Sequence, residues 1–147
     1  MSYALDVNML LYASDTSSPR HAAAKGFLER CAQGPETCCV AWITLMSDLR
    51  IATHAAIFDR PRQPAQAQAN VEKLISRTHV RTLSELEGFW DTYSQLTAQP
   101  PVRGNLVPDA HLAAILHQHG VATLYSADTD FRRFDFLDVR DPTAETQ

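Results

Sequence analysis

The chain has 147 residues, of which 45% are hydrophobic and 20% charged, and its formal net charge is −4. This length suits one domain with a sizeable core, and this composition is that of an ordinary globular protein. The negative charge excludes a uniformly basic surface that coats nucleic acid unaided. It does not exclude a nuclease, because aspartates that hold a divalent metal add to the negative count. We expect a single domain over 1–141, followed by a short frayed tail over 142–147.

Cellular location follows from three absences. The cysteines Cys31, Cys38 and Cys39 are odd in number and lack metal-ligand spacing, which indicates reduced and mostly buried thiols. No apolar run approaches the roughly 20 residues that a membrane span requires. The N-terminus also lacks the charged and then apolar segments of a signal peptide. We therefore expect a cytoplasmic protein without a membrane partner.

The first half of the chain alternates between short apolar runs and helical patterns. A run too short for a helix precedes Asp6 and predicts a buried strand, after which Asn8 can cap a helix. Residues 19–33 predict a second helix, because Pro19 suits a first helical turn. The run 37–40 predicts the second strand, and 41–53 predict a helix with apolar residues at spacings of three and four. The predicted buried side of the helix 19–33 comprises Ala22, Ala23, Phe27, Leu28 and Cys31.

The second half continues the same alternation. Helices are predicted over 65–77, over 84–99 with a capping pattern at Ser84, and from the segment 104–109 to about Gly120. Short β-prone runs predict three further strands, at 80–83, 121–125 and 136–139. Alternating strands and helices predict right-handed βαβ crossovers and a mostly parallel sheet. The expected fold class is therefore α/β, a three-layer α/β/α sandwich.

Four aspartates occupy related places in this predicted fold. Asp6 follows the first strand, and Asp128 and Asp130 follow the strand 121–125. Asp109 lies in the first turn of the helix before that strand, where the helix dipole favours a negative charge. Carboxyl ends of parallel strands lie at one edge of a sheet, so these side chains can converge. Converging carboxylates repel one another, and a hard cation such as Mg²⁺ or Mn²⁺ relieves that repulsion.

Each of these acids also has a purely structural interpretation. Asp6 and Asp109 can serve as helix caps, and Asp128 and Asp130 can form an Asx-type turn. The shared edge favours the metal interpretation. A metal site of this kind orients a phosphodiester, activates a water and stabilises the leaving oxygen.

Four segments in order resemble the motifs of one family: LDVNMLLYA at 5–13, LRIAT at 49–53, GNLVPDA at 104–110 and SADTDF at 126–131. They resemble those of PIN-domain ribonucleases, and most of all the VapC-type toxins of bacterial toxin–antitoxin pairs. The resemblance implies a PIN-like central sheet and a Mg²⁺- or Mn²⁺-dependent endoribonuclease. It also implies a homodimer held inactive by a small VapB-type antitoxin protein. The usual RNA substrates of that family are structured RNAs of the translation machinery.

The resemblance also assigns roles to particular residues. Asp6 and Asp109 match the two principal metal ligands, Asp128 matches the next acid, and Asp130 matches the weaker acid after it. Three polar residues match supporting positions beside these acids: Asn8, Asn105 and Ser126. Separately from the resemblance, Arg50 and Arg132 are weak candidates for contacts with RNA phosphates, since arginine binds phosphate well.

One position departs from the family pattern. Many PIN domains carry a Glu on the helix after the second strand, two residues before the Leu-Arg pair. Here Ser47 holds that position and Asp48 follows it. One residue around a helix is about 100°, so Asp48 does not simply replace the Glu. Either a local helix shift brings Asp48 to the metal site, or Asp48 plays no metal role, which is the expectation we adopt.

Two other functions compete with the nuclease. The missing Glu favours a catalytically weakened PIN scaffold that only binds its antitoxin. A haloacid-dehalogenase-type phosphatase would use Asp6 as a nucleophile. It requires a second acid at position 8, where this chain has Asn8, and a downstream lysine near the phosphate, but no lysine follows Lys73. The aromatic residues Trp42, Phe89 and Trp90 are predicted to lie in the core or at a dimer interface.

Overall fold

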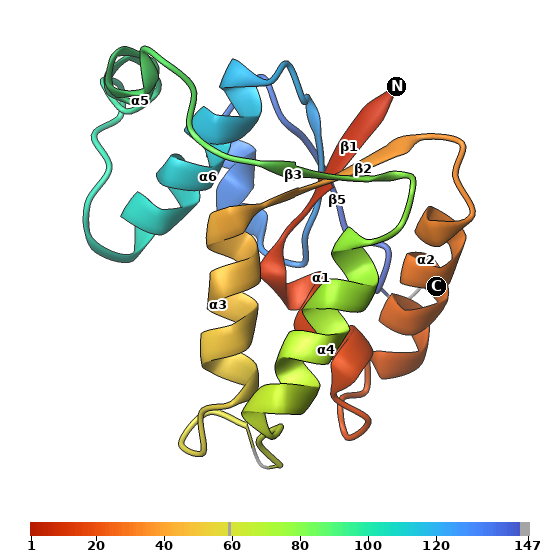
Figure 1. Ribbon diagram of the computed structural model, residues 1–147. Coiled ribbons are helices and arrows are strands. Elements are labelled where there is room, and N and C mark those ends of the chain that lie inside the picture. Colours follow the sequence, from red (N-terminus) through yellow and green to blue (C-terminus); the bar gives the residue numbers. More distant parts are fainter. Residues whose placement is uncertain (59, 145–147) are drawn as a thin grey trace.

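The computed structural model describes residues 1–58 and 60–144, and a parallel sheet lies at its centre (Figure 1). Its strands lie in the order β3-β2-β1-β4-β5, and each pair of neighbours is parallel. This confirms the predicted parallel sheet. The strands are β1 (Ser2–Leu5), β2 (Thr37–Ala41), β3 (Val80–Leu83), β4 (Thr123–Tyr125) and β5 (Asp138–Arg140).

Helices cover both faces of this sheet, which confirms the three-layer α/β/α architecture. Helices α1, α2 and α4 pack on one face, and α5 and α6 lie on the other (Figure 1). Helix α3 begins where β2 ends and extends away from the sheet edge. The helices are α1 (Val7–Ser14), α2 (His21–Ala32), α3 (Trp42–Ala52), α4 (Pro64–Ile75), α5 (Phe89–Leu96) and α6 (Val107–Gln118), with short 3₁₀ turns at Gly104–Leu106 and Thr129–Arg133.

The alternation of side chains along β1 divides the core in two. Ala4 packs in the cluster that includes Ala113 and other apolar residues of α6. Tyr3 and Leu5 point to the opposite face, in the cluster that includes Phe27 of α2. Strand β1 is central and buried on both faces, so its carboxyl end is held in place. Asp6 comes directly after this end and is therefore held at the edge of the sheet.

The helix predicted over 84–99 is shorter than expected, and its predicted start is wrong. Helix α5 begins at Phe89, after Gly88 with a φ of 82°. Side chains at the end of α6 bind the backbone of the segment before α5: Gln118 Oε1 accepts a hydrogen bond from Leu86 N (2.8 Å), and Nε2 of His119, the residue after α6, lies 2.8 Å from Ser84 O. The backbone groups at Ser84 and Leu86 are bound to α6, so the capping pattern at Ser84 starts no helix.

Several smaller predictions also needed correction. The cap of α1 is Asp6 rather than Asn8, because Asp6 Oδ1 accepts a hydrogen bond from Val7 N. On α2, Phe27 is buried as predicted, whereas Ala22 and Ala23 are exposed. The last strand is β5 at Asp138–Arg140, two residues after the predicted start. Cys38 and Cys39 are buried, Cys31 is partly buried, and all three are free thiols.

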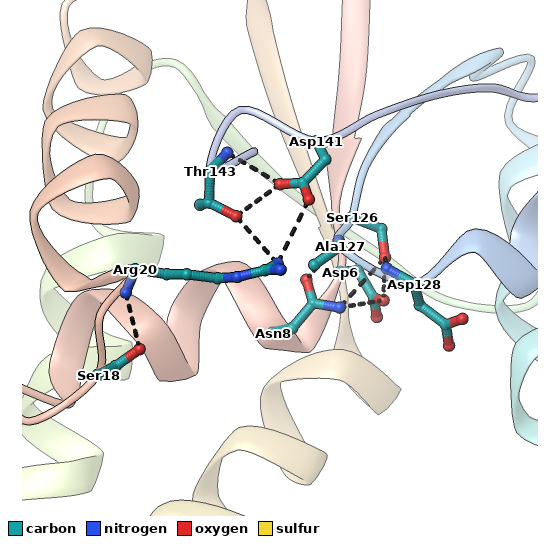
Figure 2. A network of polar contacts seen from close by, with 9 residues as sticks. All are labelled: Asp6, Asn8, Ser18, Arg20, Ser126, Ala127, Asp128, Asp141 and Thr143. Atoms are coloured by element: carbon teal, nitrogen blue, oxygen red, sulfur yellow. Dashed lines mark hydrogen bonds and ion pairs between the residues drawn. The ribbon is translucent and has the colours of Figure 1, made fainter. Parts of the chain in front are cut away.

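The chain end is tied down as far as the structure describes it. Thr143 is buried, its Oγ1 donates a 2.6 Å hydrogen bond to Asp141, and Arg20 pairs with Asp141 at 3.4 Å (Figure 2). Residues 142–144 of the predicted tail are therefore held against the start of α2, and 145–147 lie outside the described residues. None of the described helices is long and apolar enough to cross a membrane.

Candidate metal centre

The four predicted acids gather at the carboxyl edge of the sheet. Asp6 and Asp128 lie just beyond β1 and β4, Asp109 lies in the first turn of α6, and Asp130 lies in the 3₁₀ turn after β4. Carboxylate oxygens of Asp109, Asp128 and Asp130 all lie within 4.8 Å of one another. Asp6 and Asp109 line one cavity of about 140 Å³. The sequence-based expectation that these side chains converge is therefore met.

Asp6 is held more firmly than the other acids. Its side chain is 8% exposed, and its Oδ1 accepts a hydrogen bond of 2.7 Å from Val7 N. Its Oδ2 accepts one of 2.7 Å from Ser126 Oγ and one of 3.2 Å from Asn8 Nδ2. Burial raises the pKa of Asp6, and the hydrogen bonds from Ser126 and Val7 act against that rise. These bonds fix the orientation of the Asp6 carboxylate.

Ser126 and Asn8 form a polar junction between the ends of β1 and β4 (Figure 2). Ser126 Oγ donates to Asp6 and accepts hydrogen bonds from Asp128 N (2.9 Å) and Asn8 Nδ2 (3.2 Å). A hydroxyl has one donor and two acceptor sites, so all three are used. Asn8 Oδ1 also accepts a hydrogen bond from Ala127 N (3.2 Å). The junction thus sets the position of Asp128 relative to Asp6.

Asp109 is half-buried in the first turn of α6, and the charges of the other acids act on it. Burial, followed by the charges of Asp128, Asp6 and Asp130, raises the pKa of Asp109 to about 6. None of the ion pairs between described residues includes any of these four acids. The site therefore concentrates negative charge and offers only hard oxygen donors, which is the donor set that Mg²⁺ and Mn²⁺ prefer.

The structural interpretation of Asp128 is also correct. Its Oδ1 accepts a hydrogen bond of 2.9 Å from Asp130 N and caps the 3₁₀ turn. This bond uses one oxygen of the carboxylate and brings Asp130 back toward Asp109. The turn and the acidic cluster are therefore parts of one arrangement, and neither interpretation excludes the other.

Known proteins resemble this chain along almost all of its length. The PIN domain family matches residues 3–137. The chain belongs to the PIN-domain family. Ribonuclease VapC48 of Mycobacterium tuberculosis is 42% identical to this PIN domain over 142 residues, which cover 97% of this chain and 98% of that relative. Ribonuclease VapC43 of the same organism is 34% identical over 138 residues, covering 94% and 93% of the two chains.

Solved structures agree in fold. Mycobacterium tuberculosis VapC20, described as a sarcin-ricin loop cleaving toxin, has a TM-score of 0.69 at 19% identity, covering 94% of this PIN domain and 98% of that chain. Rickettsia felis VapBC2, bound to a DNA fragment from its promoter, has a TM-score of 0.68 at 19% identity, covering 96% and 98%. The family match rules out the haloacid-dehalogenase alternative for this PIN domain.

Helix α3 presents Ser47, not Asp48, to the acids. Ser47 lines the cavity of about 140 Å³ together with Asp6 and Asp109. Asp48 lines a different cavity, between α1, α2, α3 and α4. The two residues therefore line different cavities, as expected for neighbours about 100° apart around a helix, and no helix shift brings Asp48 into the cavity of the acids.

One cavity residue was missed from the sequence. Thr44 is 4% exposed and lines the same cavity as Ser47. It lies three residues before Ser47 on α3, so the two hydroxyls share a helix face. Applying that spacing to the predicted helix 41–53 would have identified it.

Among the described residues, no hydrogen bond or ion pair joins the three remaining predicted residues, Asn105, Arg132 and Arg50, to the acids. Asn105 is exposed in the 3₁₀ turn before α6, and no hydrogen bond between described residues joins it to Asp109. Arg132 is exposed two residues after Asp130, and Arg50 is exposed in the last turn of α3. Both side chains are exposed, and their contact with an RNA phosphate stays a prediction.

Proposed function

We propose that this PIN domain is the toxin of a VapBC-type toxin–antitoxin pair and a Mg²⁺- or Mn²⁺-dependent endoribonuclease. Its proposed substrate is a structured RNA of the translation machinery, and its proposed location is the cytoplasm. The observation that carries the proposal is the cluster of Asp109, Asp128 and Asp130 carboxylates within 4.8 Å of one another. Relatives named VapC ribonucleases over nearly the full chain support the same activity.

The residues of the site fit a hard divalent cation. Asp6, Asp109 and Asp128 would hold the ion, and Asp130 would add negative charge beside it. Burial, and after it the repulsion from Asp128, Asp6 and Asp130, raises the pKa of Asp109, and none of the ion pairs between described side chains offsets that repulsion, so a bound cation would relieve it. When bound, the metal supplies Lewis acidity and a water of lowered pKa for hydrolysis of the phosphodiester.

The protein's own groups position the reactants. Ser126 and Asn8 hold the Asp6 carboxylate in one orientation, so it requires little reorganisation when substrate arrives. The exposed guanidinium of Arg132 can bind an RNA phosphate beside the acids, as can Arg50 from α3. Ser47 and Thr44 line the cavity with neutral hydroxyls, which add no further repulsion toward a phosphate.

Two protein partners belong to the proposal. A VapB-type antitoxin would inhibit the nuclease, as solved complexes of VapBC proteins with the same fold suggest. A second copy of the chain would cover exposed apolar side chains on α3 and α5, including Trp42 (42% exposed), Met46 (50%) and Trp90 (71%). Light scattering at micromolar concentration should give a dimer mass, and a monomer mass would contradict the proposed homodimer.

Ser47 supports a second candidate, a PIN scaffold that binds its antitoxin and has lost cleavage. The cavity wall where the family pattern has a Glu carries only a hydroxyl. The same purified protein distinguishes the two candidates through its activity on RNA.

The test is cleavage of a structured ribosomal or transfer RNA by the purified protein, with and without Mn²⁺. We expect cleavage with Mg²⁺ or Mn²⁺, none in excess EDTA, and none from Asp109→Asn with metal. Asp91→Asn, an exposed acid on α5, is the matched control and should cleave like the parent. Undiminished cleavage in EDTA would contradict the metal mechanism, and no cleavage under any condition would favour the inactive scaffold.

A further inference from the structure

The cavity of about 140 Å³ beside the acids has a polar wall that carries no charge. Asp6 and Asp109 are the charged residues among those that line it. The other polar side chains of its lining are the hydroxyls of Thr44 and Ser47 on α3. Helix α3 begins at the carboxyl end of β2, the strand beside β1, so its first turns face the same space as Asp6 (Figure 1). Neutral hydroxyls and carboxylates therefore share one small cavity.

Three helices, α1, α3 and α6, begin at this cavity. The residues of their first turns that line it are Val7, Ile43, Thr44, Pro108 and Asp109. Backbone N–H groups in a first turn have no partner within the helix and give that end a partial positive charge. The cap residue of α3, Ala41, makes no side-chain hydrogen bond to them. The three helix ends thus reduce the negative potential that the two acids give the cavity.

Thr44 has a buried hydroxyl that no other group in the described part of the chain binds. The residue is 4% exposed, and no hydrogen bond among residues 1–58 and 60–144 involves its side chain. Thr53 and Thr97, at the ends of α3 and α5, differ: each donates to a carbonyl four residues earlier, at 2.7 and 2.8 Å. Arg62 Nε is the fully enclosed polar atom without a partner among the described side chains, so the Thr44 hydroxyl is not sealed in the core and opens to the cavity. A buried hydroxyl without a partner is costly, which indicates a ligand in the cavity.

Ser47 adds a second hydroxyl on the same face of α3. It is half-buried and comes three residues after Thr44, a spacing that puts both side chains on one side of the helix. An ionised Glu at this position, as in the family pattern, accepts hydrogen bonds or binds a cation, whereas a serine hydroxyl can also donate. The wall therefore offers two donors to an anion in place of one more carboxylate.

We propose that the hydroxyls of Thr44 and Ser47 donate hydrogen bonds to a phosphate group that enters this cavity. The inference rests on the proposed nuclease, in which this group is the phosphate of the RNA that is cleaved, and the two hydroxyls are then catalytic residues. They bind its non-bridging oxygens and neither give nor take a proton. The cavity exceeds the roughly 30 Å³ that one water occupies in the liquid, so it has room for an oxygen of such a group.

Charge determines when a phosphate can enter. Ionised Asp6 and Asp109 repel an anion, so we expect no phosphate binding without a divalent cation. Once that negative charge is neutralised, the helix ends and the two hydroxyls decide how tightly the phosphate binds and how it is oriented. Ser47→Glu should therefore have opposite effects, with tighter binding of the cation and weaker binding of phosphate.

The main experiment measures binding of inorganic phosphate by phosphorus NMR, with Mg²⁺ and in EDTA, to four forms of the protein. These are the parent, Thr44→Val, which replaces the hydroxyl by a methyl, Thr44→Ser, which keeps it, and the matched control Thr78→Val, at an exposed threonine after α4. With Mg²⁺ we expect Thr44→Val to raise the phosphate Kd by roughly tenfold or more, because a hydrogen bond to a charged group is lost. Thr44→Ser and Thr78→Val should change it by less than about threefold. None of the four should bind phosphate in EDTA.

Two further measurements separate this role from a structural role and from a metal ligand. In EDTA without phosphate, Thr44→Val should have a Tm no lower than that of the parent, because its hydroxyl has no partner to lose. Calorimetric titration should give the two proteins the same Kd for Mg²⁺ within about threefold. A lower Tm would show that the hydroxyl is bonded within the fold, and a Mg²⁺ Kd raised about tenfold or more would show that it serves the cation. Either result overturns the proposal.

Cleavage of RNA separates this proposal from the proposed function. We expect Thr44→Val to lower kcat/KM by roughly tenfold or more and Thr44→Ser to restore most of it. If Thr44→Val cleaves RNA and binds phosphate like the parent, the nuclease stands and the role of the hydroxyls is wrong. If the parent binds phosphate more tightly than Thr44→Val but neither cleaves RNA, the phosphate site stands and the nuclease is wrong. A parent that binds no phosphate with Mg²⁺ overturns the site, whatever its activity.

Discussion

Ser126 Oγ lies 2.7 Å from Oδ2 of Asp6 and donates a hydrogen bond to it, so the ends of β4 and β1 are joined at the acidic cluster. The same oxygen accepts the backbone N–H of Asp128. One hydroxyl therefore orients one acid and positions the backbone of another. Loss of this hydroxyl should affect both the fold and the metal site.

Ser126→Ala should lower the free energy of unfolding by about 1–3 kcal/mol, because Asp6 and the Asp128 N–H each lose a buried partner. It should also raise the pKa of Asp6 further, since the Ser126 bond acts against the effect of burial. Mn²⁺ affinity near pH 6 should fall as a result. Thermal unfolding and Mn²⁺ titration measure these effects, with the exposed Ser94→Ala on α5 as the control. Equal Mn²⁺ affinity in parent and variant would show that the junction does not support the metal site.

Asp6→Asn should abolish RNA cleavage and leave the metal-free fold as stable as the parent or slightly more stable. The variant removes one of several carboxylates that repel one another, and this relief offsets the loss of a hydrogen bond, because the single amide oxygen of Asn can accept from Ser126 or from Val7 N but not from both. The pKa of Asp109 should fall from about 6, because the charge of Asp6 is one of the causes of its rise. NMR titration of Asp109 and unfolding in EDTA measure both effects. Full activity in the variant would exclude Asp6 as a metal ligand.

The stability of the protein should depend on pH through Asp48. Burial raises the pKa of Asp48 from 3.8 to about 6 in the folded state, so the unfolded chain ionises first as the pH rises. Below about pH 4, Asp48 is protonated in both the folded and the unfolded state, so it does not affect the pH dependence of stability there. The folded state is increasingly penalised between about pH 4 and 6, and the full penalty of up to about 3 kcal/mol holds above pH 6.

Asp48→Asn should therefore unfold at higher denaturant concentration than the parent at pH 7.5, and the two should converge near pH 4. Urea unfolding of both proteins across this pH range provides the measurement. Glu29→Gln, which removes an exposed acid, should show no such pH-dependent gap. A gap that widens as the pH falls would mean that Asp48 has a partner in the folded free protein.

The parallel sheet and the converging acids could be predicted because they follow from local patterns. Asp6 and Asp128 follow strands, and all strands of a parallel sheet end at the same edge. The start of α5 could not be predicted, because the capping pattern at Ser84 is overridden by Gln118, which is distant in sequence. The cavity beside Asp48 was equally hidden, since it depends on how α1, α2 and α4 pack against α3.

The family pattern and this chain differ most clearly at Ser47, and a substitution there tests the difference. Ser47 lines the cavity of Asp6 and Asp109, so Ser47→Glu places an anionic oxygen where it can reach a bound ion. We expect this variant to bind Mn²⁺ more tightly than the parent, and to lose stability without metal because it adds repulsion. Asp48→Asn should change Mn²⁺ affinity by less than about 1.4 kcal/mol, which is under tenfold, since Asp48 faces the other cavity. Calorimetric titration of Mn²⁺ into parent and both variants measures the three affinities. If Asp48→Asn weakens binding a hundredfold while Ser47→Glu changes nothing, then α3 presents Asp48 to the metal in solution and the assignment of the two cavities is reversed.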